Sequence, residues 1–258
     1  MVKKHLRYLC ILILFVPAFI HAQSIERRFI NFTLEDCLSQ STISDIKQDA
    51  LGYTWLATAD GVNVFDGSNF EVYKNRYNDS NSLSDNFVYA ILPFNDGTVW
   101  AITQGRMINE IDVKTKKVKK IAPINELRED MYSAKQLLED AQGNIWLSTY
   151  ENGIIVLNRA GKVVKKIDQA SGLIKSDIVQ FVHMGKDFNW VATASGLSKI
   201  SPDLNRAEHY FDGRLISTVH TFRNNLYLSF YDSLKVTQST ILNPTKISKT
   251  LIEGEPII

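Results

Sequence analysis

The amino-acid sequence predicts an all-β protein made of repeated four-stranded sheets. The strongest sign is a set of tryptophans that recur at intervals of 45, 46 and 44 residues, Trp55, Trp100, Trp146 and Trp190. A fixed period of this length indicates a supersecondary unit repeated along the chain. Within each unit, short runs with strand character are separated by turn residues. The second run of each unit is apolar or small on both sides, so it needs cover on both faces.

The repeated phrase consists of a turn, a strand that ends in threonine in the first four copies, and a second turn. A glycine stands three residues before each of the first three tryptophans and supplies the positive φ angle that a tight turn needs. A fifth, weaker copy has a tyrosine in the tryptophan position, and Asn224 in its turn tolerates the same backbone conformation. The five copies are centred on Trp55, Trp100, Trp146, Trp190 and Tyr227.

The first copy shows how a unit divides into strands. Its first run alternates between apolar and polar residues, and a turn of four residues follows it. Asp66 and Gly67 form a pair typical of a hairpin turn. The expected strands are 43–48, 53–58, 62–65 and 70–73, with turns at 49–52, 59–61 and 66–67.

Four-stranded sheets that need cover on both faces can pack face to face around an axis, which is the β-propeller arrangement. An identical position in every repeat is what packing between such sheets requires, so we expect the tryptophans to form the core instead of binding sugar rings. The threonines that end the same strand should offer their hydroxyls to nearby backbone groups. These threonines are Thr58, Thr103, Thr149 and Thr193.

The chain begins with a segment typical of a secretory signal peptide. Residues 1–7 are basic, residues 9–20 are apolar, and cleavage after Ala22 fits the pattern. A retained membrane anchor is the alternative, but an apolar run of about a dozen residues interrupted by Pro17 is short for a span. We therefore expect a signal peptide at 1–22 and a propeller domain at 23–258, with membrane contact only through the signal segment.

The charge balance excludes some classes of partner. Residues 1–22 contain Lys3, Lys4 and Arg7, so their removal reduces the 29 basic residues to 26, against 28 acidic ones, and the formal charge becomes −2. This balance gives no electrostatic basis for binding nucleic acid or an anionic membrane. Cys37 is then the single cysteine, so no internal disulfide forms and stability must come from packing.

The repeats resemble the two-component regulator propeller family. The residues that carry the resemblance are Leu38-Ser39, 49–52, Trp55–Thr58, Gly61–Gly67 and Phe70–Tyr73. It covers about residues 28–235 and is more specific for fold than for function, because propellers host many activities. The resemblance implies the periplasmic sensor region of a hybrid histidine kinase or a related one-component regulator. It also suggests an oligosaccharide as ligand.

The strand count predicts an incomplete ring. Family propellers usually have seven blades, which need about 315 residues, whereas five copies and a fragment are visible here. Phe29–Phe32 resembles an outer strand that would complete a last blade, yet the fifth copy has its own expected third and outer strands at 234–238 and 246–251. We therefore expect a chain truncated at its C-terminus, with a five-bladed ring as the alternative. Open sheet edges would favour self-association or pairing with the missing blades.

No catalytic or cofactor motif is visible. The patterns GxxxxGK[ST], HExxH, GxSxG and CxxC are absent, so phosphate-loop, zinc-protease, serine-hydrolase and thiol-redox chemistry have no support. His183, His209 and His220 lie at unrelated positions in their repeats, which argues against a metal site. We expect no cofactor and no enzymatic activity in this chain, and a kinase would lie in a missing C-terminal part.

Candidate binding residues lie where the repeats vary. The loops between an outer strand and the next inner strand emerge at the same end of the sheets as the turns between second and third strands. Aromatic and charged side chains in these loops could bind a polar ligand such as an oligosaccharide. The candidates are Tyr77, Arg106, Tyr132, Tyr150, Glu151, Tyr231 and Asp232.

Three classes of function remain open. The one we favour is a non-catalytic periplasmic ligand-sensing module of a two-component signalling protein. A propeller lyase would need a histidine and a glutamate that converge on the central face, and His220 is placed for this without an evident partner. A protein-interaction scaffold is the third. Convergent polar side chains would favour the sensor, and a flat apolar face would favour the scaffold.

Overall fold

The computed structural model describes residues 30–124, 134–231, 235–241, 243–246 and 249–252. The predicted signal peptide and the candidates Tyr132 and Asp232 lie outside these residues. The described residues from Thr33 onward belong to one compact unit. Its described elements are strands, apart from a short 3-10 helix at Leu34–Asp36.

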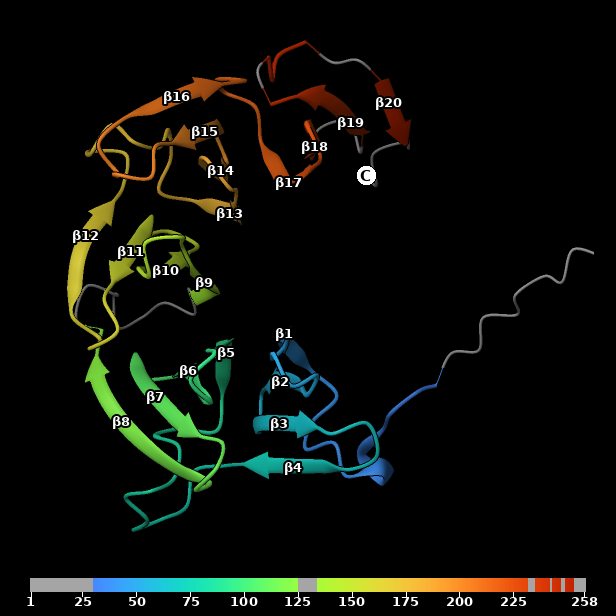
Figure 1. Cartoon of the computed structure of the whole chain (residues 1–258), viewed down its shortest axis with the longest axis vertical. Coiled ribbons are helices and arrows are strands. Elements are labelled where there is room, and N and C mark those ends of the chain that lie inside the picture. The colour runs from blue at the N-terminus through green and yellow to red at the C-terminus, as the bar shows by residue number, and fades with distance from the viewer. Residues whose placement is uncertain (1–29, 125–133, 232–234, 242, 247–248, 253–258) are drawn as a thin grey trace, which may run out of the picture. The chain divides into compact units, whose positions relative to one another are not determined.

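The described strands form five antiparallel four-stranded sheets, each built from consecutive strands (Figure 1). Blade 1 contains β1 (Ile43–Gln48), β2 (Thr54–Thr58), β3 (Gly61–Phe65) and β4 (Phe70–Tyr73), and blade 2 contains β5 (Val88–Pro93), β6 (Thr98–Thr103), β7 (Met107–Asp112) and β8 (Lys117–Pro123). Blade 3 contains β9 (Ala134–Glu139), β10 (Ile145–Thr149), β11 (Ile154–Leu157) and β12 (Val163–Ile167). Blade 4 contains β13 (Val179–Met184), β14 (Asn189–Thr193), β15 (Gly196–Ile200) and β16 (Ala207–Tyr210), and blade 5 contains β17 (Ile216–Phe222), β18 (Asn225–Phe230), β19 (Lys235–Thr240) and β20 (Lys249–Ile252).

The inner strands connect the blades in chain order. Strand β1 contacts β5, β5 contacts β9, β9 contacts β13, and β13 contacts β17. Among the described residues, no contact of comparable extent joins β17 to β1. This arrangement confirms the predicted all-β propeller. The expected strand at Phe29–Phe32 is wrong for residues 30–32, which have no regular structure, while residue 29 lies outside the described part.

The tryptophans fill the spaces between successive blades, as predicted. All four are at most 1% exposed, Trp55, Trp100, Trp146 and Trp190. Each packs with apolar residues of the following blade, for example Trp146 with Val182 and Val191. Tyr227 in blade 5 occupies the same position but is only half buried. The Trp-bearing face of one blade and the opposite face of the next therefore form a single core layer, repeated along the chain.

An aspartate fixes both the first turn and the indole in two blades. The Oδ1 atom of Asp140 accepts hydrogen bonds from the main-chain N–H groups of Gln142 and Asn144, both at 2.9 Å. Its Oδ2 atom accepts the indole N–H of Trp146 at 2.9 Å. Asp49 makes the corresponding bond to Trp55, also at 2.9 Å. One carboxylate therefore satisfies the turn and a buried indole together.

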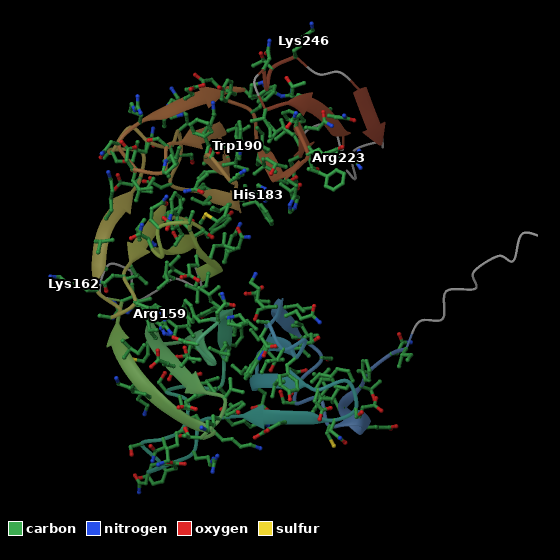
Figure 2. The ribbon with its side chains drawn as sticks, viewed as in Figure 1. Arg159, Lys162, His183, Trp190, Arg223 and Lys246 are labelled. Atoms are coloured by element: carbon green, nitrogen blue, oxygen red, sulfur yellow. The ribbon has the colours of Figure 1, made fainter. Side chains whose placement is uncertain are left out.

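Blade 2 has Phe94 in the position of this aspartate and uses a different acceptor. The indole N–H of Trp100 donates to Oε2 of Glu110 at 3.0 Å. Arg159 lies in the β11–β12 turn of blade 3 (Figure 2). It donates to the same oxygen at 2.9 Å and to Asp96 Oδ2 at 2.8 Å. Its guanidinium carbon lies 3.6 Å from the centroid of the Phe94 ring. An arginine of the next blade therefore completes the tryptophan site of blade 2.

The threonines that end the second strands bond backbone carbonyls, as predicted. Thr58 donates to Gly61 O at 2.9 Å, and Thr149 donates to Gly153 O at 2.8 Å. Thr103 and Thr193 make the same type of bond, to Met107 O and Gly196 O. Each hydroxyl stabilises the turn that leads into the third strand.

A buried polar cluster joins this threonine to the loop before the inner strand in blades 1 and 2. In blade 2, Asn109 Oδ1 accepts from the main-chain N–H of Ser84 at 2.9 Å, and its Nδ2 donates to Ser84 Oγ at 3.0 Å and Thr103 Oγ1 at 3.1 Å. Ser39, Thr58 and Asn63 repeat this cluster in blade 1. Blade 3 has Ile155 at the same register position, so a well-packed apolar residue can replace the asparagine.

Replacing Asn109 by alanine is expected to lower the free energy of unfolding by about 1 to 3 kcal/mol, because buried donors and acceptors lose their partners. Urea unfolding followed by tryptophan fluorescence measures the change. The matched control is Asn95→Ala, an exposed turn residue of the same blade, which should alter stability by less than about 0.5 kcal/mol. Equal effects of the two substitutions would contradict the assigned role of the cluster.

Candidate functional site

The described loops and turns meet at one end of the sheets, where Gly61 N–H donates to Asn86 O and Gly153 N–H donates to Asp177 O. The described candidate residues are dispersed along this end. Tyr77 lies in the β4–β5 loop and is 93% exposed. It lines a hollow of about 380 Å³ together with Arg76 and Lys120. Arg76 is paired with Asp79 of the same loop at 3.7 Å. This open hollow is built almost entirely from one loop.

Three other candidates occupy separate turns. Arg106 is in the β6–β7 turn with a left-handed φ of 65°, and its carbonyl accepts from the N–H of Ile124 at 2.7 Å. Glu151 is exposed after β10, and Tyr231, after β18, is 67% exposed. In the described part of the chain, no hydrogen bond or ring contact joins Tyr77, Tyr150 and Tyr231 to one another. The candidates in the described part of the chain therefore do not form one site.

Every inner strand has a β-bulge at the same place, which leaves one residue in each blade without a register partner on the second strand. The register between first and second strands shifts by one residue near the start of all five inner strands. Bulges redirect side chains out of the regular sheet pattern and are common near functional sites. The bulged residues are Ser44, Tyr89, Lys135, Gln180 and Ser217.

The bulged residues differ in what they contact. Ser44 donates to the carbonyl of Val88 at 2.6 Å, and Ser217 donates to the carbonyl of Ser229 at 3.1 Å. These two hydroxyls stabilise the sheets themselves. Tyr89 packs against the core and its ring is centred 4.9 Å from that of Phe87, whereas Lys135 and Gln180 contact each other.

Lys135, Gln180 and Tyr150 come together and are called the inner-strand cluster below. Lys135 Nζ donates to Gln180 Oε1 at 3.1 Å, which links β9 to β13. The same ammonium lies 4.9 Å from the centroid of the Tyr150 ring, in the turn after β10. Tyr150 is 43% exposed, so the cluster is open to solvent on one side. An ammonium, an amide and an aromatic ring are groups that bind polar ring-shaped ligands.

Burial weakens the charged form of Lys135. The side chain is half buried, and loss of hydration lowers the pKa of its ammonium below the ordinary value. The cation–π contact and the amide oxygen compensate only part of that loss, because neither carries a full negative charge.

Of the cluster, sequence reasoning found Tyr150 but missed Lys135 and Gln180, because it searched loops and both residues lie in strands. A signal was present in the repeat register. Tyr89, Lys135 and Gln180 stand 46 and 45 residues apart. Three blades have a large polar or aromatic residue at this register position, and the other two blades have a serine there. The position therefore varies within an otherwise repeated scaffold.

Two other polar side chains of the inner strands hold neighbouring blades together. Asp45 Oδ2 accepts from the N–H of Ile91 at 3.1 Å, and Gln136 Oε1 accepts from the N–H of Val182 at 2.8 Å. Burial raises the pKa of Asp45, although the nearby Lys47 acts in the opposite direction. Because both side chains bond the backbone of the next blade, we assign them to the scaffold.

A pair of histidines lies between blades 4 and 5. His183 Nε2 accepts from the N–H of Thr221 at 3.2 Å and lies 2.7 Å from its hydroxyl, on the inner strand shown in Figure 2. The His220 ring is centred 5.4 Å from that of His183 and 4.9 Å from that of Phe181. No described carboxylate bonds either histidine, and the described residues contain no group of metal ligands. Within the described part of the chain, the pair therefore has no carboxylate partner of the kind that acid–base chemistry uses.

Stability is expected to fall as the pH drops from about 7.5 to 5. Burial and the charge of His220 lower the pKa of His183, so the unfolded chain takes up a proton, near pH 6.5, before the folded chain does. Proton uptake by the unfolded state alone favours unfolding as the pH decreases. Urea unfolding of wild type and His183→Gln across this range measures the contribution, since glutamine can still accept from Thr221. A variant with an unchanged pH slope would contradict it.

Two further hollows are less suited to a specific ligand. One of about 620 Å³ lies beside β15 and β16, where Lys199 pairs with Glu208 at 3.5 Å and lies 4.0 Å from the centroid of the Phe188 ring. Another of about 540 Å³ lies between the first turns of blades 1 and 2, beside the exposed Leu51. The basic residues there that make no ion pair with a described carboxylate, Arg206 and Lys114, are exposed, whereas Lys135 is half buried.

The geometry defines a β-propeller with a polar cluster on its inner strands. No protein-family model matches the chain. Within the described residues, no helix is long and apolar enough to cross a membrane. The chain is 45% identical over 74 residues to "Histidine kinase P4" of Formosa agariphila, a match to 29% of this chain and 5% of that protein.

Solved structures show the same fold. The extracellular domain of a protein assigned to the hybrid two-component systems of B. thetaiotaomicron matches 85% of this chain and 31% of that one, with 20% identity and a TM-score of 0.66. A second such domain from B. thetaiotaomicron matches 82% and 30%, with 21% identity and a TM-score of 0.64. The WD40 domain of Neurospora crassa Pan2 matches 80% and 63%, with 10% identity and a TM-score of 0.60.

The comparisons bear out the resemblance that the repeats indicated. Extracellular domains of two-component systems are among the similar structures, and a histidine kinase is a similar sequence. The chain spans about a third of the length of those extracellular domains and one-twentieth of the kinase. At these identities the structural likeness establishes the fold.

Proposed function

We propose that this chain is an exported, non-catalytic ligand-sensing module of a signalling protein of the hybrid histidine kinase type. The observation that carries the proposal is the inner-strand cluster, in which polar and aromatic groups from two adjacent blades converge at an accessible place. The similarity to extracellular domains of two-component systems supports the sensor role, and the predicted signal peptide supports export to the periplasm. Under this proposal, a separate segment or protein supplies the signalling output.

The ligand that fits the cluster is an oligosaccharide. The Tyr150 ring offers an apolar face to a sugar ring, while Lys135 and Gln180 offer hydrogen bonds to its oxygens. Lys135 in β9 and Gln180 in β13 both belong to a rigid sheet scaffold, so little ordering of these side chains is needed on binding. Among the described residues, His183 bonds Thr221 and no carboxylate contacts His183 or His220, which favours recognition over acid–base turnover.

Thermal unfolding of the full chain with neutral and acidic oligosaccharides tests the proposal. A ligand present at about 100 times its Kd should add about 2.7 kcal/mol to the free energy of unfolding and raise the Tm. Chromatography of the recovered sugar should show it unchanged, as a sensor requires. Cleavage of the sugar would instead support the lyase, and the absence of any shift across the panel would favour the protein-interaction scaffold.

A further inference from the structure

Lys135 differs from the paired lysines of this protein in its surroundings. Six described lysines lie 2.5 to 3.5 Å from a carboxylate oxygen, Lys47, Lys74, Lys116, Lys166, Lys175 and Lys199. Lys135 has a neutral amide oxygen as its polar partner. No described carboxylate lies within ion-pair distance of its ammonium. Glu151 is adjacent to Tyr150 in sequence, but it is exposed and makes no ion pair with Lys135.

This arrangement leaves a partly dehydrated positive charge without a counter-charge. A solvent-exposed lysine is stabilised by water, and a buried one is normally paired. Lys135 has lost part of its hydration and is held in place by Gln180 and the Tyr150 ring. A site of this kind gains most from a ligand that brings a negative charge, because charge-assisted hydrogen bonds are about twice as strong as neutral ones.

We propose that the inner-strand cluster binds an acidic oligosaccharide and that Lys135 is the counter-ion of its carboxylate or sulfate group. The inference rests on the proposed sensor function and specifies its ligand. Gln180 keeps its oxygen on Lys135, and its two amide N–H groups are donors for the anion or an adjacent hydroxyl. The Tyr150 ring contacts the sugar that carries the acidic group.

The position of the cluster supports selectivity for charge. Lys135 and Gln180 both project from β-bulges in strands and are joined across two blades, so the ammonium has a fixed place. The formal charge of the chain without residues 1–22 is −2, so the protein as a whole does not attract polyanions. Recognition of an acidic sugar must then depend on a local site.

Isothermal titration of the full chain with three tetrasaccharides tests the proposal: tetragalacturonate, a sulfated galactan fragment and neutral galactotetraose. We expect an acidic probe to bind and the neutral one to bind at least about tenfold more weakly. Lys135→Met should weaken acidic binding by about 10- to 100-fold, and Lys135→Arg should retain most of it. Which acidic probe binds distinguishes a carboxylate from a sulfate ligand.

The matched control is Lys162→Met. Lys162 is exposed in the β11–β12 turn of the same blade, away from the inner strands (Figure 2), so its loss should leave the affinity unchanged. Circular dichroism shows whether Lys135→Met keeps its fold. Neutral binding that is as tight as acidic binding, or acidic binding that survives Lys135→Met, overturns the acidic ligand and leaves the sensor proposal standing. Absence of binding by all three probes removes both.

Discussion

Trp146→Ala is expected to lower the free energy of unfolding by about 3 to 5 kcal/mol, among the largest effects of any single substitution in this chain. The side chain is fully buried between blades 3 and 4, in one hydrophobic cluster with Val182 and Val191. Removing it leaves a cavity that rigid sheets cannot close. It also leaves Asp140 with a carboxylate oxygen that has lost the indole N–H. Urea unfolding followed by circular dichroism gives the free energy.

Tyr227→Ala is the matched control. Tyr227 occupies the same position in blade 5, but it is only half buried, so its removal should cost about 1 to 2 kcal/mol. A comparison of the two substitutions therefore separates burial between blades from loss of an aromatic residue as such. Equal losses at both positions, or a small loss at Trp146, would show that the blade interface does not depend on the indole.

The strands and their pairing were predictable because the sequence repeats. In blade 1, β1 and β4 begin and end where the alternating pattern predicts, and β2 and β3 differ by one residue at one end. Trp55 and Thr58 occupy the core and the turn that their recurrence indicates. Repetition is informative here because every blade packs against its neighbours in the same way. A residue that recurs in each repeat therefore indicates a contact that recurs in each blade.

Contacts between blades were harder to predict. The bulge that turns Lys135 out of its strand adds one residue to a run of ordinary strand residues, and nothing in the local sequence marks it. Arg159 reaches the tryptophan site of the preceding blade through a contact 49 residues distant in sequence, to Glu110. The sequence shows that Phe94 stands where other blades have the turn aspartate. It does not show which residue accepts the indole N–H of Trp100 instead. Such pairings depend on the angle between blades.

The same reason explains the outcome for the candidate site. Aromatic and charged residues in loops were chosen because loops vary, yet Tyr77 and Tyr231 remain exposed and separate. Tyr150 belongs to the cluster because Lys135 approaches it from the inner strand of its own blade. A position in the repeat register would have been a better guide than membership of a loop, since inner strands are the elements that bring different blades close together.

Gly153→Ala is expected to destabilise the protein by about 2 to 5 kcal/mol, the sum of backbone strain and a steric clash. Gly153 has a left-handed φ of 68°, which costs any residue with a Cβ atom about 1 to 2 kcal/mol. A Cβ atom here would also lie 2.3 Å from the carbonyl oxygen of Ile167, so the outer strand would have to move. That movement would disturb the carbonyl of Gly153, which accepts the hydroxyl of Thr149.

Gly97→Ala isolates the strain from the clash. Gly97 also has a positive φ, 84°, but a Cβ atom there would meet nothing within 4 Å. Its substitution should therefore cost only the backbone term of about 1 to 2 kcal/mol. Urea unfolding of both variants gives the difference, which measures how tightly the second turn of blade 3 is packed against its outer strand. If Gly153→Ala were no more destabilising than Gly97→Ala, the outer strand would be free to yield, and the close approach at Ile167 would not constrain this blade.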